Sequence, residues 1–314
     1  MMKIYKTMDE QGLFREIDTL EKGAWINLVS PTVQEINTLC QSIGVQEDFI
    51  RYALDPEERA RIDVEDDQVL ILIDTPIIER DKDTGIFSTI PLGLIVVRDD
   101  YFITVSTLSL PVIKEFVDCK VKGFYTFKKT RFVLQVLYKV ATYYLSYLKY
   151  INRETDKAEE LLKKSMRNEE LIKMLSLEKS LVYFTTALKA NELVMEKLMR
   201  SKVIKMYEED EDILEDAIVE NRQAIEMGTI YRDILNGTMD AYASVISNNL
   251  NIVMKLLASV TIVLSVPTIV ASLWGMNVKG LPFASSPYGF GIVLAIAAVI
   301  SLGAFLILKK KDML

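Results

Sequence analysis

Polar side chains recur along one stripe of an otherwise apolar segment that runs from Asn251 to Asn277. No residue between Lys255 and Lys279 is charged. Steps of three and four residues from Asn251 reach, in order, Met254, Ala258, Thr261, Ser265, Thr268, Ser272 and Gly275. Residues at this spacing share one face of an α-helix, and Val, Ile and Leu occupy much of the remaining surface. The hydroxyl and carboxamide groups of such a stripe can bind water and, through water, a hydrated cation.

Two interpretations of this stripe are open. Gly, Ala, Ser and Thr are common where membrane helices pack closely, so the stripe is compatible with a helix–helix contact. Alternatively, it forms the wall of a water-filled pore, because polar groups inside a membrane mark ion pathways. The stripe begins at the carboxamide of Asn251, and the segment ends at that of Asn277. Polar groups at both ends favour an ion path.

Two predicted membrane helices position the stripe. The uncharged run 256–278 covers 23 positions, and a bilayer core requires roughly 20 apolar residues. The first transmembrane helix is therefore predicted at 251–277. A short outer loop at 278–287 is followed by a second uncharged span at 288–308.

The charges that flank these spans predict their orientation. Lys255 and the run Lys309-Lys310-Lys311 lie at the same end of the predicted hairpin. The positive-inside rule therefore places both termini, including the basic tail 309–314, in the cytosol of a multi-pass protein of the cell membrane. Trp274 and Tyr288 then lie near the outer interface, as in an aromatic belt.

A long helix leads into the first span. Between Asp212 and Trp274 the first proline is Pro267. About 60 residues at 1.5 Å each would make a rod of about 90 Å, much longer than a bilayer. Residues 207–250 are therefore predicted to be a cytosolic stalk. Its intermittent apolar seam cannot be buried by one helix, so the stalk is expected to associate with copies of itself.

The start of the stalk is acidic. Carboxylates occupy positions 208, 209, 210, 211, 212, 215, 216 and 220. In one interpretation they are a solvated helix start that complements the helix dipole. In the other they are a surface for divalent cations, because hard cations prefer carboxylate oxygens and would relieve the repulsion between like charges.

Residues 1–120 predict a cytosolic α/β domain. Thr32 and Glu35 have the spacing of a capping box, which predicts a helix through Ile43. Four β-prone runs, at 24–29, 69–78, 90–97 and 101–106, are expected to form one sheet with helices on its faces. Short helices are predicted at 46–54 and 110–117.

Residues 121–206 predict an antiparallel hairpin of long helices, because apolar residues recur at intervals of three and four. The fold class is thus an α+β domain with a long helical stalk and two transmembrane helices.

Composition limits the chemistry. The 314 residues contain no histidine, which excludes imidazole metal sites and histidine bases. Cys40 and Cys119 belong to no paired-cysteine motif and are expected to be reduced thiols. A net charge of −7 without a strong basic patch argues against a nucleic-acid partner. No phosphate-binding loop or nucleophile motif occurs, so neither an enzyme nor a catalytic cofactor is expected. The N-terminus lacks the apolar core of a cleaved signal peptide.

The tripeptide Gly275-Met276-Asn277 ends the first helix of a C-terminal two-helix hairpin behind a large charged region. In this position it resembles the GMN motif of the CorA metal-ion transporter family. The resemblance implies a funnel-shaped homopentamer in the lipid bilayer, whose five first membrane helices line one pore. It implies that Gly275, Met276 and Asn277 form the selectivity filter, with Asn277 ringing the outer mouth.

The same resemblance implies the pore-lining positions Asn251, Met254, Leu257, Thr261, Ser265 and Thr268, of which Thr261 and Ser265 fit by spacing. In the family, the positions of Met254 and Leu257 form a hydrophobic constriction. They would gate by excluding water when the ring narrows. Ser265 departs from the methionine often found there, and Pro267 falls one residue later than the usual proline.

A regulatory metal site is also implied. Asp216 matches, by spacing from Asn277, a stalk carboxylate that helps to bind an inhibitory Mg²⁺ between subunits. The position of its partner carboxylate holds Tyr52, and Asp55 is the candidate nearby, as is Asp48. The outer loop carries Lys279 where the family commonly has acidic residues.

We therefore predict transport of divalent cations through a central pore gated by cytosolic Mg²⁺, which is both cargo and regulator. Co²⁺ and Ni²⁺ are further candidate ions. One alternative is a zinc transporter of the related ZntB type, with or without proton coupling. A second is a membrane-tethered scaffold or sensor that has no pore.

Overall fold

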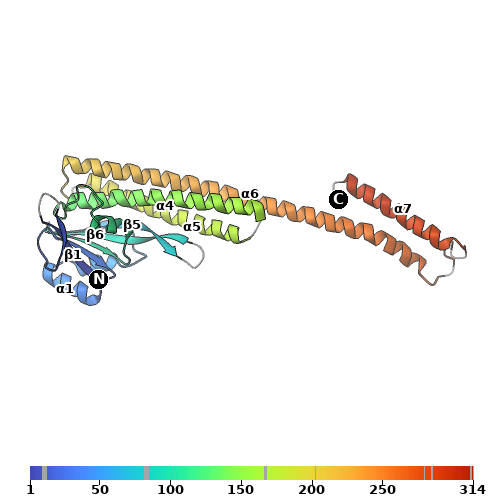
Figure 1. Ribbon diagram of the computed structural model, residues 1–314, viewed down its shortest axis with the longest axis horizontal. Coiled ribbons are helices and arrows are strands. Elements are labelled where there is room, and N and C mark those ends of the chain that lie inside the picture. The colour runs from blue at the N-terminus through green and yellow to red at the C-terminus, as the bar shows by residue number, and fades with distance from the viewer. Residues whose placement is uncertain are drawn as a thin grey trace. The chain divides into compact units, whose positions relative to one another are not determined.

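The computed structural model describes residues 1–8, 13–80, 85–98, 100–165, 168–201, 203–278, 280–283, 286–311 and 313 (Figure 1). The chain divides into two compact units, Met1–Gly237 and Thr238–Leu314.

A seven-stranded sheet organises the first unit, with the strand order β2-β1-β3-β7-β6-β5-β4 among the described residues. The strands are β1 (Met2–Thr7), β2 (Phe14–Ile17), β3 (Trp25–Val29), β4 (Arg61–Glu65), β5 (Gln68–Arg80), β6 (Gly85–Val97) and β7 (Tyr101–Ser106). Paired neighbours are antiparallel except β3 and β7, which are parallel. The single sheet and its four predicted strands are confirmed. The prediction missed β1, β2 and β4, which are short and half-polar.

Helices α1 (Val33–Ile43) and α2 (Glu47–Tyr52) cover one face of the sheet. Their buried residues include Leu39 and Ile50, which pack with strand residues such as Leu72 and Ile95. Helix α2 is shorter than the predicted 46–54. The capping box predicted at the start of α1 is confirmed, because the side chain of Thr32 accepts from the N–H of Glu35 and the Glu35 carboxylate accepts from the N–H of Thr32.

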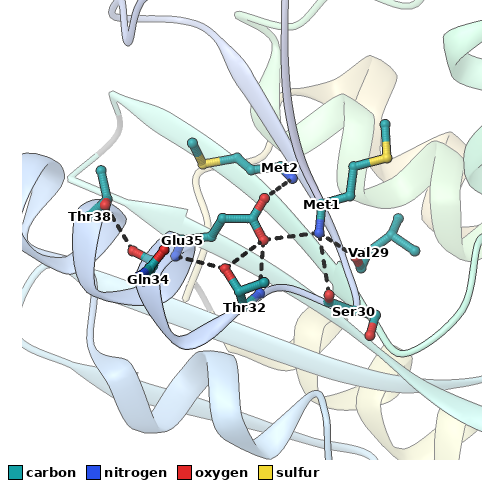
Figure 2. Close-up of polar contacts among 8 residues, drawn as sticks. All are labelled: Met1, Met2, Val29, Ser30, Thr32, Gln34, Glu35 and Thr38. Atoms are coloured by element: carbon teal, nitrogen blue, oxygen red, sulfur yellow. Dashed lines mark hydrogen bonds and ion pairs between the residues drawn. The ribbon is translucent and has the colours of Figure 1, made fainter.

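The same glutamate also fixes the beginning of the chain (Figure 2). Glu35 accepts hydrogen bonds from the Met1 ammonium group at 3.0 Å and from the N–H of Met2 at 2.7 Å. The N–H of Thr32 and these two donors lower the pKa of Glu35 to about 2. These hydrogen bonds join the N-terminal cap of α1 to the first residue of β1.

Two long helices, α4 (Lys129–Ser165) and α5 (Asn168–Arg200), cover the other face of the sheet, opposite α1 (Figure 1). Aromatic rings fill this layer: Phe132 of α4 lies 4.9 Å from Trp25 and 4.5 Å from Phe102, measured between ring centroids. Helix α3 (Pro111–Val117) packs against α4. The predicted helical hairpin and the predicted short third helix are both present.

The first part of α6 (Glu208–Trp274) packs on α5 within the first unit. Asn221, which is fully buried, donates a hydrogen bond to the carbonyl of Leu188 at 2.9 Å. Arg222 forms ion pairs with Glu192 at 2.6 Å and Glu196 at 2.9 Å. Helix α6 begins one residue after the predicted start of the stalk at 207 and continues through Pro267 to Trp274, three residues before the end predicted for the first transmembrane helix at 277.

The second unit contains the rest of α6 and helix α7 (Gly289–Lys310), joined by a short turn. Both helices carry an apolar stretch long enough to cross a membrane. The second helix was predicted at 288–308 and extends two residues further, into the lysine run. A proline inside a membrane helix is tolerated when neighbouring groups satisfy the freed carbonyl, and Pro267 does not interrupt α6.

Candidate ion path

The polar stripe of α6 lies on the side of that helix that α7 does not cover. Contact with α7 and the C-terminal residues buries Ser259 and Val270, and it partly buries Val263 and Val266. The hydroxyl of Ser259 donates to the carbonyl of Met313 at 2.8 Å. At about 100° per residue, the polar stripe is centred roughly half a turn away from these four residues. On α6 the residues buried in this contact are therefore apolar apart from Ser259, and they do not belong to the stripe.

The stripe is exposed in the single chain. Met254 and Leu257 expose 58% and 57% of their surface, and Asn251, Thr261 and Thr268 are also exposed. Ser265 is half-buried. Packing inside the hairpin thus does not account for the small and hydroxylated residues. The stripe is available to other copies of the chain or to a water-filled passage.

Three hydroxyl groups of the stripe donate along their own helix. Thr261 donates to the carbonyl of Leu257 at 2.8 Å, Ser265 to that of Thr261 at 2.7 Å, and Thr268 to that of Leu264 at 3.1 Å. A hydroxyl whose hydrogen is used in this way keeps its oxygen lone pairs free as acceptors. This face therefore offers acceptor oxygens, which suit water molecules that surround a cation.

The tripeptide Gly275-Met276-Asn277 follows the last residue of α6 as a non-helical extension. The N–H of Gly275 donates to the carbonyl of Ala271 at 2.8 Å, and a Cβ atom added at Gly275 would lie 3.2 Å from that oxygen. Met276 and Asn277 are exposed. The C-terminal end of a helix carries a partial negative charge, so the tripeptide lies where a cation is attracted.

A hydrogen bond from the Trp274 side chain joins the end of α6 to the turn that follows it. The indole N–H of Trp274 donates to the carbonyl of Pro282 at 3.0 Å. Lys279, which the sequence places in the loop, lies outside the described residues.

The opposite end of the hairpin carries the basic residues. The bond between Ser259 and Met313 brings the end of the chain beside α6, one turn from Lys255. Lys255 and the run Lys309–Lys311 are exposed. The two helices therefore run in opposite directions, and their lysines mark one side of the membrane, as the positive-inside rule requires.

Neither of the two candidate regulatory carboxylates belongs to a metal-binding cluster among the described residues. Asp216 is exposed and lines a shallow cavity of about 230 Å³ with Lys122 and Tyr138. Asp55 follows α2, where its carboxylate accepts from the N–H of Glu57 at 3.0 Å. Among the described residues of the single chain, no group of three or more Asp, Glu or Cys side chains is arranged to hold a metal ion.

The acidic start of α6 is partly engaged within the chain. Asp210 is 5% exposed, and its carboxylate accepts from the N–H of Tyr207 at 3.2 Å, which caps the helix. Glu209 forms an ion pair with Arg131 of α4 at 3.1 Å. These contacts support the interpretation of this segment as a helix start. Sequence reasoning missed Arg131, because no local pattern joins residues 78 positions apart.

Comparison with known proteins agrees with this architecture. The model of the family described as CorA-like Mg²⁺ transporter protein matches residues 21–310. The cobalt/magnesium transport protein CorA of Methanocaldococcus jannaschii is 29% identical over 285 residues, which cover 88% of this chain and 86% of that protein. The complete structure of the CorA magnesium transporter from the same organism superimposes with a TM-score of 0.84 at 26% identity, over 98% of this chain and 96% of that one.

A more distant likeness concerns the fold alone. The cytoplasmic domain of ZntB from Vibrio parahaemolyticus is 11% identical, with a TM-score of 0.58 over 79% of this chain and 97% of that one.

Proposed function

Because the chain belongs to the CorA family of Mg²⁺ transporters, we propose that the polar stripe of α6 lines the path of the transported ion. The protein transports divalent cations across the cell membrane, and its large N-terminal region lies on the cytoplasmic side. The observation that carries the proposal is the exposure of the stripe on the side of α6 that faces away from α7. Five copies of α6 around one axis would present Asn251, Thr261, Ser265 and Thr268 to a common lumen and their aliphatic sides to α7 and lipid.

In this proposal Gly275, Met276 and Asn277 form the selectivity filter. Mg²⁺ dehydrates reluctantly, so a filter that holds it must bind its water shell. The neutral carboxamide of Asn277 and nearby main-chain carbonyls can do so without trapping the ion, whereas conduction would be slowed by carboxylates that bind it more tightly. The negative end of the α6 dipole adds attraction for the cation at this position.

Gating is assigned to Met254 and Leu257. Both are more than half exposed in the single chain; Met254 lies on the stripe, and Leu257 lies beside it, three residues further along α6. A ring of such side chains excludes water when it narrows, and a hydrated ion cannot pass a dry constriction.

We assign the regulatory ion to the neighbourhood of Asp216, with Asp55 of an adjacent subunit as the candidate partner, because Asp216 is exposed on α6.

Mg²⁺ is the favoured cargo, with Co²⁺ as a second ion and Ni²⁺ as a third. The name of the Methanocaldococcus relative includes cobalt and magnesium. The zinc alternative has only a likeness of fold to support it. We propose no enzymatic activity and no catalytic cofactor for the chain.

Flux into proteoliposomes tests the filter. Asn277→Ala is expected to lower Mg²⁺ uptake by about tenfold or more, because it removes the hydrogen-bonding groups that hold the water shell of the ion. Asn248→Ala is the matched control, because Asn248 is exposed on α6 outside the stripe. Uptake by Asn277→Ala equal to that of the unmodified protein, with the oligomer intact, would remove the filter assignment. Competition by Zn²⁺ under an imposed pH gradient distinguishes the zinc alternative.

A further inference from the structure

A cavity of about 800 Å³ opens in the first unit, at the start of α4 and the start of α6. One wall consists of residues 127–131, and the other consists of Lys205 and residues 207–210. These segments lie about 80 positions apart in the sequence, and the hydroxyl of Thr130 joins them by donating to the carbonyl of Lys205 at 2.9 Å. The volume lies within the range of small-molecule sites, roughly 300–1,000 Å³.

Four cationic side chains line this cavity: Lys128, Lys129, Arg131 and Lys205. Among the described residues, only Arg131 of these four has an ion pair, which joins its Nη1 to Glu209 at 3.1 Å. The Nε atom of Arg131 is buried and has no hydrogen-bond partner among them. A buried N–H without an acceptor is costly, so a ligand oxygen that reached this edge of the guanidinium group after Glu209 had moved would satisfy it.

Three carboxylates, those of Glu208, Glu209 and Asp210, line the same cavity. The side chain of Glu209 is 80% exposed, whereas that of Arg131 is 27% exposed. Glu209 can therefore rotate into solvent at little cost, because an exposed ion pair contributes little stability. Asp210 is directed to the main chain of Tyr207. An entering anion would thus compete chiefly with Glu209 for Arg131.

Aromatic surface borders the same cations. Tyr207 is 63% exposed and Phe127 is 41% exposed, and both line the cavity. The ammonium group of Lys205 lies 5.5 Å from the centroid of the Tyr207 ring. Exposed rings of this kind stack readily on the flat face of a nucleobase.

We infer that this cavity binds a nucleoside polyphosphate. Lysine and arginine are the side chains that hold phosphate oxygens, and Arg131 can hold them with both edges of its guanidinium group once Glu209 has moved. The base would stack against Tyr207 or Phe127. The inference is independent of the ion path, since every residue that carries it belongs to the first unit.

Calorimetric titration of the full-length protein in detergent with ATP tests the inference. ATP is expected to bind more tightly than AMP and more tightly than inorganic tripolyphosphate, because both the phosphates and the base are recognised. Lys129→Gln and Arg131→Gln are each expected to weaken ATP binding by about tenfold, the effect of losing one charge-assisted hydrogen bond. Lys149→Gln is the matched control on α4, since Lys149 is exposed and does not line the cavity.

A gain of affinity gives a second, opposite readout. Glu209→Gln is expected to tighten ATP binding, because it removes the carboxylate that competes with the phosphates for Arg131.

An unchanged melting temperature shows that each variant is folded. The inference is overturned if the folded protein does not bind ATP at millimolar concentration, or if Lys129→Gln and Arg131→Gln bind it as well as Lys149→Gln does. Equal affinity for tripolyphosphate and ATP would overturn the assignment of the aromatic wall to a nucleobase.

Discussion

Asn191 of α5 binds the main chain of Asp74 in β5 as a neighbouring strand would. Its Oδ1 accepts from the N–H of Asp74 at 2.8 Å, and its Nδ2 donates to the carbonyl of Asp74 at 2.8 Å. The pairing of β5 with the adjacent strand β4 stops at Leu72 and Arg61, two residues before Asp74 along β5. A side chain of a helix thus satisfies main-chain groups that the sheet leaves open, and Asn191 is fully buried there.

Asn191→Leu is expected to destabilise the first unit. Leucine has a similar volume but leaves the N–H of Asp74 without its acceptor, whereas the carbonyl keeps the hydroxyl of Tyr144 as a donor at 3.1 Å. The cost is about 2–3 kcal/mol, and the melting temperature of the detergent-solubilised protein should fall by ~5 °C. Asn152→Leu, at an exposed hydrogen bond on α4, is the control. Equal melting temperatures for the two variants would contradict this account.

Asp74 itself is expected to make stability depend on pH. Burial raises the pKa of its carboxyl group from 3.8 to about 6. The folded state therefore binds this proton more tightly than the unfolded state does, so the stabilisation is complete below pH 3.8 and is lost as the pH rises through 6. Asp74→Asn keeps the shape of the neutral acid and should raise the melting temperature at pH 8 but hardly at pH 4. A variant that is no more stable than the unmodified protein at pH 8 would be evidence against this.

Gly228 of α6 packs closely against α5 and α4. A Cβ atom there would lie 2.8 Å from the Cγ2 of Thr185 and 3.5 Å from the Cδ2 of Leu148. Gly228→Ala is expected to cost about 1–2 kcal/mol, because overpacking outweighs the gain in helix propensity. Gly237→Ala is the matched control on the same helix: no described atom lies within 4 Å of its Cβ position, so it should be neutral or stabilising. The two melting temperatures, measured side by side, check the difference in sign.

Leu257 is expected to limit ion flow when cytosolic Mg²⁺ is high. Leu257→Ala widens the proposed dry constriction, so Mg²⁺ uptake by proteoliposomes loaded with Mg²⁺ should rise several-fold. Leu256→Ala is the control, because the neighbouring residue points about 100° away around the helix. If both variants behaved like the unmodified protein, Leu257 would not belong to the gate.

Local sequence patterns determined the membrane hairpin, the long helix α6 and the polar stripe of this protein. The two apolar runs, the lysines that flank them and the long stretch before Pro267 predict the hairpin and α6, because helix formation and membrane insertion depend on consecutive residues. The capping box of Thr32 and Glu35 predicts the start of α1 for the same reason. Periodicity also identified the polar stripe, from Asn251 to Gly275.

Tertiary structure decided what no local pattern could. Strands β2 and β4 are short and half-polar, and their existence depends on a partner strand. The pairing of Arg131 with Glu209 and that of Asn191 with Asp74 join residues far apart in the chain. The helical periodicity of the sequence also left open which side of α6 meets α7. The contact of Ser259 with Met313 settles that side, because a helix has a face only relative to what packs against it.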